Sequence, residues 1–409
     1  MKILFLTDNF PPEVNAAATR VYERACYWVK NGHEVTILTC APNFPKGKVF
    51  EGYKNKWYQE EIMNGIRVIR VKTFISSNEG FMLRTLDFIS FMMSAIFFGI
   101  FIKKHDVVMI TSPQFFTAIA GWILSVIHRR PFVFEVGDLW PESIKGVGFL
   151  SDSFIYRFLE KIELFLYKKA AAIVCLTSSF KINLQQRGIN SEKIHVVLNA
   201  VDLTLYHPQD KNVNLLQETE ILKEKFVIGY TGTHGMAHDL INILYAAEIL
   251  QKDTSVHFLF VGEGAEKEKL VSYAQKQQLS NVHFFPLQPK KKIPAFWSIC
   301  DIAIIHLKDD KIFKKVIPSK MFEAMAMGLP LLVVSPGGES KELVEKNKCG
   351  LFIYSGKSQL LADTIIKLKQ DPDMMAKFKQ ASYQASKLYS RETQAENVIK
   401  ILNSITKHL

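Results

Sequence analysis

Short and long apolar segments alternate along this chain, and their order constrains its fold more than any other feature. In the first half, runs typical of strands stand at 2–7, 34–39, 66–71, 106–111, 131–136, 172–176 and 194–198. The longer segments between them have the pattern of helices, at 16–30, 81–103, 114–128, 152–170 and 178–187. Strands that alternate with helices form a parallel sheet with helices on both faces. The first half is therefore expected to be an α/β domain of the doubly wound type.

The alternation pauses in a polar passage, 202–225, which is typical of a linker, and then starts again. Strands are expected at 226–230, 256–261, 281–285, 301–307 and 330–334. The remaining periodic segments are expected to be helices, at 238–251, 265–277, 291–298, 338–346, 357–370, 373–388 and 391–408. A chain of 409 residues is also too long for one ordinary core. We therefore expect two Rossmann-like domains, 1–203 and 204–388, with ligands bound in a central cleft between the carboxyl ends of their sheets.

The net charge of +11 falls partly in short basic clusters such as Lys290-Lys291-Lys292. Such clusters suit nucleic acid, anionic lipid or a phosphorylated ligand. The chain has no helix-turn-helix, zinc-finger or aromatic RNA-binding signature, so nucleic acid is the least favoured partner of the three. Its five cysteines are scattered, with no pair at metal-ligand spacing, and Met1-Lys2 leads directly into a core-like strand. These features predict a reducing, cytoplasmic location without a signal peptide, a disulfide or a structural zinc site.

A single carboxylate interrupts an apolar stretch late in the second domain. Pro318-Ser319 and Gly328 are start and stop signals for a helix, and from Met321 to Val334 every residue except Glu323 is apolar, Gly or Pro. Burying an unpaired charge is costly, so Glu323 needs a partner. Lys320, three residues earlier, can neutralise it on the same face of the helix. Alternatively, Glu323 accepts hydrogen bonds from a polyhydroxyl ligand while Lys320 and the helix N-terminus attract its phosphate.

The loop after the first strand of the second domain is another candidate for a ligand contact. It contains Gly232-Thr233-His234-Gly235, whose small residues allow a close approach of the backbone to a ligand. The helix that follows offers its N-terminal amides to phosphate. The loop is neither a Walker loop nor a dinucleotide-binding Gly-x-Gly-x-x-Gly fingerprint, which argues against a hydride-transfer enzyme. An ordinary tight turn is the alternative.

Further candidate residues follow two strands of the first domain. The loop after the first strand holds Glu13 and Asn15, and Pro11-Pro12 stiffens it. Asp138 and Glu142 follow the strand at 131–136, so both should lie at the carboxyl edge of the sheet. Asp138 is a candidate catalytic carboxylate that orients a hydroxyl or stabilises positive charge at a sugar carbon. It is equally a candidate for capping the turn that follows.

The segment 88–102 contains fifteen residues without a charge, which departs from the pattern of a soluble domain. It is too short to span a bilayer comfortably, since about 20 residues are needed. Its excess of Phe and Met favours a helix that lies in the membrane interface over a wholly buried one. The residues that we expect to contact the membrane are Phe91, Phe97, Phe98, Phe101, Lys103 and Lys104.

Short motifs along nearly the whole chain, in a fixed order, resemble those of one enzyme family. They are Phe10-Pro11-Pro12-Glu13, Gly32-His33-Glu34-Val35, Pro42-Asn43-Phe44-Pro45, Asp138-Leu139-Trp140-Pro141-Glu142-Ser143, Asn199-Ala200-Val201-Asp202, Gly232-Thr233-His234-Gly235-Met236-Ala237-His238, Val261-Gly262-Glu263-Gly264 and Pro318-Ser319-Lys320-Met321-Phe322-Glu323. In this combination the chain resembles the retaining GT-B glycosyltransferases of glycosyltransferase family 4. The resemblance is greatest to the bacterial branch that acts on amino- or deoxy-sugars in O-antigen and capsule assembly.

The resemblance implies a GT-B fold whose second domain binds a nucleotide sugar, usually UDP-linked, without a metal ion or other cofactor. Glu323 would bind the ribose hydroxyls. Lys320, Ser319 and the loop Gly232-Thr233-His234-Gly235 would bind the diphosphate, and Pro286-Leu287 would lie beside the base. The catalytic residues that we expect are Asp138, Lys320 and Glu323.

For the first domain the resemblance implies that it receives the acceptor. Glu13, Asn15, Asp138 and Glu142 are the residues that would lie near it. The final helix, within 389–409, would return from the second domain to brace the first.

The expected reaction is transfer of a sugar from a UDP-sugar to a polyprenyl-diphosphate-linked saccharide, with retention at the anomeric carbon. A lipid-linked acceptor implies a peripheral enzyme on the inner face of the cytoplasmic membrane. Many family members carry two glutamates eight positions apart, whereas Lys315 occupies the earlier position here. Two alternatives stay open: a UDP-sugar epimerase or hydrolase of the same fold, and a non-catalytic scaffold that binds a sugar nucleotide or lipid.

Overall fold

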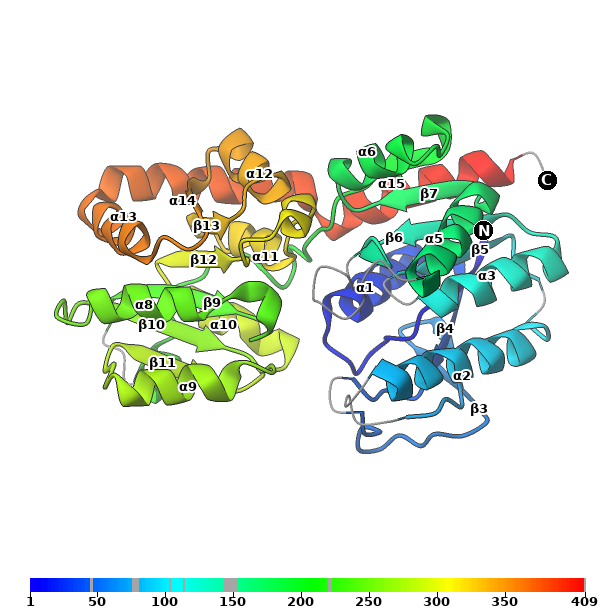
Figure 1. Ribbon diagram of the computed structural model, residues 1–409, viewed down its shortest axis with the longest axis horizontal. Helices are drawn as coiled ribbons and strands as arrows, with labels where there is room; N and C mark the ends of the chain where they lie inside the picture. The colour runs from blue at the N-terminus through cyan, green and yellow to red at the C-terminus, as the bar shows by residue number, and fades with distance from the viewer. Residues whose placement is uncertain are drawn as a thin grey trace. The chain divides into compact units, whose positions relative to one another are not determined.

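The computed structural model describes residues 1–44, 47–75, 81–102, 104–112, 115–142, 154–219 and 223–407. The chain divides into two compact units. Unit 1 consists of Met1–Leu198 and the chain from Arg391 onward, and unit 2 is Asn199–Ser390. Figure 1 shows strands and helices in each unit, with the red C-terminal helix in unit 1.

Unit 1 is built on one eight-stranded sheet with the order β3-β4-β2-β1-β5-β6-β7-β8. Its strands are β1 (Lys2–Leu6), β2 (Glu34–Cys40), β3 (Tyr58–Met63), β4 (Ile66–Val71), β5 (Val107–Thr111), β6 (Phe132–Val136), β7 (Ala172–Cys175) and β8 (Ile194–Val196). All neighbouring strands are parallel except β3 and β4, which are antiparallel. Every residue of β5 and β6 is buried, as expected for central strands with helices on both faces.

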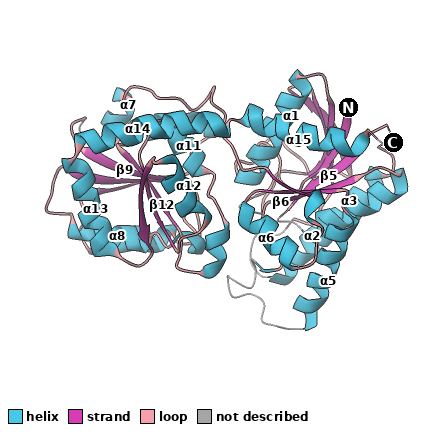
Figure 2. Cartoon of the chain, turned by 90° about the horizontal axis from the view of Figure 1, so that it is seen from above, coloured by secondary structure: helices cyan, strands magenta, loops and turns pink. Residues whose placement is uncertain are grey.

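Helices lie on both sides of this sheet in Figure 2. They are α1 (Ala16–Lys30), α2 (Phe81–Gly99), α3 (Phe115–His128), α5 (Phe154–Lys169), α6 (Ser178–Gln186), the short η1 (Ser191–Lys193) and α15 (Arg391–Thr406). The indole N–H of Trp28 in α1 donates to the backbone oxygen of Ala395 in α15 at 3.0 Å. Val398 and Leu402 are fully buried in the same core. The last helix is therefore part of the core of unit 1.

Unit 2 contains a six-stranded, fully parallel sheet with the order β11-β10-β9-β12-β13-β14. The strands are β9 (Phe226–Thr231), β10 (Val256–Val261), β11 (Val282–Phe285), β12 (Ile302–His306), β13 (Leu331–Ser335) and β14 (Gly350–Tyr354). The α-helices are α7 (Val213–Glu218), α8 (Ile241–Ile249), α9 (Lys267–Lys276), α10 (Ile293–Ser298), α11 (Lys320–Ala326), α12 (Glu339–Asn347), α13 (Ser358–Gln370) and α14 (Pro372–Ser386). The short 3-10 helices are η2 (Met236–His238), η3 (Lys290–Lys292), η4 (Lys311–Lys315) and η5 (Lys387–Tyr389).

The predicted pair of Rossmann-like α/β folds is confirmed, but three details differ from expectation. The strand β3 was not predicted because it is an edge strand with alternating exposed residues and a polar sequence. The strand β14 was also missed, since it is only five residues long and mostly half-buried. The passage 202–225 is not simply a linker, because it contains α7 and is fixed to unit 2 by an ion pair between Lys211 and Asp301 at 3.0 Å.

Candidate functional site

The order of the strands in unit 2 marks the position where a ligand is expected. The chain leaves β9 toward β10 on one side, and β12 lies on the other side of β9. Ligands of parallel α/β sheets bind at the carboxyl ends of strands where the direction of the connections reverses in this way. The loop that begins at Gly232 follows β9, and His306 ends β12. This end of the sheet therefore brings together the loop, the end of β12 and the helix α11 that follows it.

Two glycines allow the loops after β9 and β10 to approach each other. Gly232 has φ +122°, and a Cβ there would lie 2.9 Å from Nζ of Lys320. A Cβ on Gly262, which follows β10, would lie 1.9 Å from the backbone oxygen of Gly232. Any side chain at either position would displace the neighbouring loop or the lysine. The glycines therefore place the backbone of the β9 loop directly beside the amine of Lys320.

Lys320, the first residue of α11, is a buried amine without a hydrogen-bond partner. The residue is 8% exposed, and its Nζ has no partner among the described residues, Glu323 included. The Nζ lies 3.6 Å from the centroid of the Tyr230 ring. Such a contact stabilises an ammonium by about 2 kcal/mol, less than the several kcal/mol that burial of an unpaired ion costs. Burial accordingly lowers the pKa of Lys320 to about 7, although the nearby Glu323 opposes this shift.

Glu323 differs from the rest of α11 in its exposure. The other six residues of this seven-residue helix are buried, whereas Glu323 is half-buried. Ser319 occupies the N-cap position, but its hydroxyl makes no capping hydrogen bond. Glu323 is thus partly exposed on a helix that otherwise packs into the core, which is compatible with the predicted contact to a polyhydroxyl ligand.

The histidines of this site are held in fixed positions without charge. His238 Nδ1 lies 3.3 Å from the backbone oxygen of His306, and His306 Nδ1 lies 2.7 Å from that of His238. Since a carbonyl oxygen only accepts hydrogen bonds, both Nδ1 atoms carry hydrogen. Burial lowers the pKa of His238 to about 3 and that of His306 to about 4. These two residues join the β9 loop to the end of β12.

His234, a predicted donor-binding residue, has a fully buried side chain. Its imidazole is completely buried and packs near the rings of Tyr230, Phe260 and Phe284. Its backbone N–H donates to the backbone oxygen of Glu263 at 2.8 Å, so this donor is also occupied. Burial lowers the pKa of the imidazole to about 4. The residue anchors the loop from inside, and its contact with a donor stays a prediction.

In the described part of the chain, no group of three or more His, Cys, Asp or Glu residues is placed to hold a metal ion.

The pair predicted to lie beside the base, Pro286 and Leu287, follows the edge strand β11. Both residues are exposed, and 45% of Leu287 is accessible. They lie two strands away from β9 in the order of the sheet. Lys267 fixes the preceding strand end, since its Nζ donates to the backbone oxygen of Phe285 at 3.2 Å. An exposed apolar pair at this edge can stack on a flat ring.

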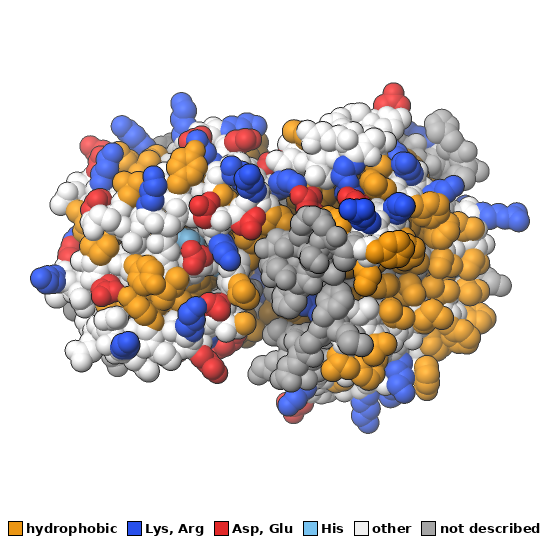
Figure 3. Space-filling view, in the orientation of Figure 1, with side chains coloured by type: hydrophobic (Ala, Val, Ile, Leu, Met, Phe, Trp, Pro, Cys, Tyr) orange, Lys and Arg blue, Asp and Glu red, His pale blue; other side chains and the backbone are white. Residues whose placement is uncertain are grey.

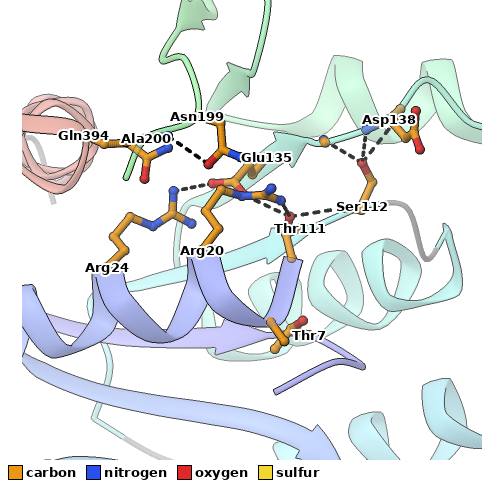
Figure 4. A network of polar contacts seen from close by, with 12 residues as sticks. Thr7, Arg20, Arg24, Thr111, Ser112, Glu135, Asp138, Asn199, Ala200 and Gln394 are labelled. Atoms are coloured by element: carbon orange, nitrogen blue, oxygen red, sulfur yellow. Dashed lines mark hydrogen bonds and ion pairs between the residues drawn. The ribbon is translucent and has the colours of Figure 1, made fainter. Parts of the chain in front are cut away.

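In unit 1, Asp138 lies in a loop that is held by the end of β5. The hydroxyl of Ser112 accepts the N–H groups of Gly137 and Asp138 at 2.9 and 3.2 Å, and it lies 3.2 Å from the Asp138 backbone oxygen (Figure 4). Burial raises the pKa of the Asp138 carboxyl to about 6, and the charge of Arg20 opposes this shift. A carboxyl with a pKa near 6 can accept or donate a proton near neutral pH. Glu142 is half-buried, and the side-chain amide of Asn183 donates to it at 3.4 Å.

Glu13 and Asn15 shape the loop after β1. The Glu13 carboxylate is buried and accepts backbone N–H groups from Phe10 at 3.1 Å and from Asn43 and Phe44 at 2.8 Å. Burial raises its pKa to about 7 in spite of these donors. The Asn15 side chain accepts the N–H of Ala18 and caps α1. Backbone groups of the loops after β1 and β2 thus occupy the Glu13 carboxylate, and the predicted contact of Glu13 and Asn15 with an acceptor stays a prediction.

The sequence analysis missed a buried ion-pair network in unit 1. Glu135 on β6 lies between Arg20 and Arg24 of α1 (Figure 4). Arg20 Nε donates to the carboxylate at 2.8 Å, and the Thr111 hydroxyl donates at 2.9 Å. Burial alone would raise the pKa of Glu135, but the two guanidinium groups lower it to about 2. A lone charge within the apolar run Phe132–Val136 was the signal that could have revealed the network.

The helix α2 presents two different faces. Phe91 is completely buried, together with Ala95 one turn later, so the prediction that Phe91 contacts a membrane is wrong. The helical period explains this result, since residues four positions apart share the face that packs inward. Phe97 and Phe101 are 60% and 68% exposed. They lie on the outer face or just after the helix.

Apolar side chains gather over α2 and α3 in Figure 3. Phe98 is half-buried, with its ring centroid 5.6 Å from that of Tyr58. Lys104 is exposed close to Phe101, whereas Lys103 lies outside the described residues. Among the described helices, α2 included, none is long and apolar enough to cross a membrane.

Two family models match the chain, one in each unit. The model for Glycosyltransferase Family 4 matches residues 17–205, and the model for Glycosyl transferases group 1 matches residues 213–385. The chain is 25% identical over 336 residues to WcaI of Escherichia coli K12, a glycosyl transferase assigned to colanic acid biosynthesis, and the match covers 80% of this chain and 82% of WcaI. It is 28% identical over 212 residues to TuaH of Bacillus subtilis 168, assigned to teichuronic acid biosynthesis, with 51% of each chain covered.

Solved structures of glycosyltransferases share the fold. HepE of Anabaena, in complex with UDP and glucose, has a TM-score of 0.74 at 19% identity over 99% of this chain and 100% of HepE. Sucrose-phosphate synthase of Thermosynechococcus elongatus has a TM-score of 0.76 at 14% identity over all of both chains. The two family models together span most of both units. The chain is therefore a glycosyltransferase of the GT-B fold, family 4-like in unit 1 and of group 1 in unit 2.

Proposed function

We propose that this glycosyltransferase moves an amino- or deoxy-hexose from a UDP-sugar to a polyprenyl-diphosphate-linked saccharide in the synthesis of O-antigen or capsule. The observation that carries the proposal is the buried Nζ of Lys320, for which the described residues offer no hydrogen-bond acceptor. A buried amine at the carboxyl end of β9 is suited to an anionic ligand, and a diphosphate supplies the missing acceptors. The proposal extends to Ser319 and to Gly232, Thr233 and Gly235 as diphosphate contacts, and to Glu323 as the ribose contact.

Similar proteins support the donor and the biological setting. HepE has been solved with UDP-glucose and with UDP. WcaI and TuaH are assigned to the biosynthesis of two different bacterial polysaccharides. We therefore include a UDP-linked donor and a role in bacterial polysaccharide biosynthesis in the proposal for this chain.

In the proposed reaction, the bond between the anomeric carbon and the UDP oxygen breaks while the acceptor hydroxyl bonds to the same face of that carbon. Lys320, as an ammonium, stabilises the charge that develops on the departing diphosphate. The departing phosphate takes the proton of the acceptor hydroxyl, so no protein nucleophile and no metal ion are proposed. The proposed role of Asp138, in unit 1, is to orient a hydroxyl or to stabilise positive charge at the sugar carbon.

A polyprenyl-linked acceptor lies in a membrane, and we include peripheral attachment to the inner face of the cytoplasmic membrane in the proposal. The exposed rings of Phe97 and Phe101 can enter the interface between headgroups and acyl chains. The exposed Lys104 can pair with anionic headgroups.

A panel of UDP-sugars incubated with the enzyme and a bacterial membrane lipid extract tests this function, with products identified by mass spectrometry. We expect one UDP-sugar to release UDP only when the lipid extract is present, and the lipid to gain the mass of that sugar. UDP release without lipid would instead indicate a hydrolase, and isomer formation without release an epimerase. Binding of the nucleotide without any turnover would indicate a scaffold. Lys320→Met is the matched variant and should lose UDP release.

A further inference from the structure

The charge state of Lys320 depends on what surrounds its amine. The groups near it are the Tyr230 ring on β9, His234 in the loop, His238 on η2 and Glu323 on its own helix. His306, at the end of β12, contacts His238. The three histidines are neutral near neutral pH, because burial lowers the pKa of each to about 4 or below. Tyr230 donates its hydroxyl to the backbone oxygen of Thr233 at 2.8 Å and offers only its ring to the amine.

Lys267 provides a comparison within the same region. Its Nζ donates to the Glu263 carboxylate at 2.7 Å, to the Gly262 oxygen at 2.9 Å and to the Phe285 oxygen at 3.2 Å. The Nζ of Lys320, in contrast, has no acceptor within the described parts of the chain. An ammonium needs acceptors for its three N–H groups when it is removed from water, whereas a neutral amine over an aromatic ring does not.

We propose that, in mildly alkaline solution, Lys320 is uncharged while the donor site is empty, and that a nucleoside diphosphate sugar binds there together with one proton that converts this amine to an ammonium. The lone pair of Nζ takes the proton from solvent, and the new ammonium donates to the diphosphate oxygens. The proton leaves again when the nucleoside diphosphate is released. This inference rests on the proposed function, because it needs a diphosphate at this site.

The proposal fixes how donor affinity depends on pH. Burial places the pKa of the empty-site amine at about 7. Below this pH the ammonium already exists, so binding takes up no proton and the affinity is constant. Above it, each bound ligand takes up one proton, and the affinity should fall about tenfold for each pH unit. A free ribose or base makes no demand on this amine, so uridine should bind without proton uptake.

Calorimetric titration of the full chain with UDP-glucose tests the proposal, in two buffers with different ionisation enthalpies. The phosphates of UDP-glucose do not titrate near neutral pH, so the difference between buffers counts protons taken up by the protein. At pH ~8.5 we expect close to one proton per bound ligand, and at pH ~6 close to none. Uridine should give none at either pH.

Two variants identify the group that takes up the proton. Lys320→Arg places a guanidinium there that stays charged at all these pH values, so proton uptake and the pH dependence of affinity should both disappear. Lys267→Arg is the control, and it should keep them. If Lys320→Arg does not bind, the titration of ¹³C-labelled lysine in the wild-type protein decides. One lysine signal should then titrate near pH ~7 in the empty protein and should stay charged when UDP-glucose is bound.

Failure of this inference can be distinguished from failure of the proposed function. UDP-glucose binding without proton uptake at pH ~8.5, or equal uptake with uridine, would overturn this inference and leave the proposed donor site standing. If neither UDP-glucose nor any other nucleotide sugar binds, both the proposed function and this inference are wrong.

Discussion

Lys320 and Glu323 stand one helical turn apart but do not form the hydrogen-bonded pair that would neutralise both. The amine points over the Tyr230 ring, and Glu323 remains accessible on an otherwise buried helix. Two ionisable groups three positions apart thus differ in burial, since Lys320 is buried over an aromatic ring and Glu323 is half-buried. The two residues are therefore proposed to contact different parts of a ligand, which is the basis of the two predictions at this scale.

Glu323→Gln should weaken UDP-glucose binding and leave stability unchanged. A hydrogen bond to a charged group contributes about 1.5–3 kcal/mol, so the affinity should fall roughly 10- to 150-fold. Calorimetric titration gives the affinity, and thermal unfolding gives the stability. Unchanged affinity together with a lower melting temperature would show that the carboxylate serves the fold rather than a ligand.

Gly232→Ala should impair the same site through Lys320. The added methyl group would lie 2.9 Å from Nζ at a backbone φ of +122°, which L residues rarely adopt. Strain of this kind costs about 1–3 kcal/mol, so both the free energy of unfolding and the UDP-glucose affinity should fall. The control is Gly188→Ala in unit 1, at a φ of +80° with nothing within 4 Å of its Cβ, which adds backbone strain but should leave the UDP-glucose affinity unchanged. Equal effects of the two substitutions would contradict the role given to Gly232.

At the scale of elements, the contact between α1 and β6 depends on charge as well as on packing. Glu135 is fully buried and is paired with Arg20 and Arg24, which are themselves buried. The same helix begins at the cap that Asn15 provides, and Arg20 also influences Asp138 in the loop after β6. The network therefore links the position of α1 to the loop that holds the candidate carboxylate.

Glu135→Gln should destabilise unit 1 by about 3–5 kcal/mol, because it leaves two buried guanidinium groups without a carboxylate. Since its pKa is lowered to about 2 in the folded state, the wild-type carboxylate contributes stability above its ordinary pKa of 4.5. That contribution is lost as the pH falls toward 2, so the difference between wild type and variant should shrink in acid. Denaturant unfolding at several pH values measures it.

The matched control for this prediction is Glu60→Gln. Glu60 also has its pKa lowered to about 2, by a hydrogen bond from Arg67, but the side chains of both are more than a third exposed. Exposed ion pairs contribute about 0–1 kcal/mol, so this substitution should change stability little. A similar loss for both variants would contradict the importance of burial.

At the scale of the whole molecule, the exposed rings of Phe97 in α2 and of Phe101 just after it are the proposed contacts with a membrane. The double substitution Phe97→Glu and Phe101→Glu should reduce co-sedimentation with vesicles that contain anionic lipid, because two exposed rings are replaced by charges. Thermal stability should be unchanged. Leu388→Glu, at a 67% exposed position in unit 2, should not affect binding.

A second comparison separates this prediction from simple unfolding. Phe91→Glu places a charge in the core and should lower the melting temperature strongly. If the double variant at Phe97 and Phe101 lowers the melting temperature as strongly as Phe91→Glu, both faces of the helix contribute to the core. The membrane prediction is then wrong.

Local sequence patterns were sufficient to predict the fold and to place several candidate residues at the carboxyl ends of strands. Apolar runs, such as those of β5 and β6, indicated the strands of the parallel sheets. The glycine after β9 indicated the loop that follows this strand. The network of Glu135 was beyond reach, because its partner Arg20 is 115 residues away in the sequence. The burial of His234 was missed for a similar reason, since the aromatic rings around it come from three separate strands. A single sequence does not show which side chains from distant segments contact each other in the folded protein.

The place of α15 in unit 1 has a consequence for synthesis on the ribosome. Unit 2 is one continuous stretch of chain, 199–390, and it can fold as soon as it has left the exit tunnel. Unit 1 has to wait, because the side of α1 that carries Trp28 is covered by Ala395, Val398 and Leu402. Until then the nascent chain displays an uncovered apolar surface that chaperones can bind. The part of the enzyme that is made first is completed last.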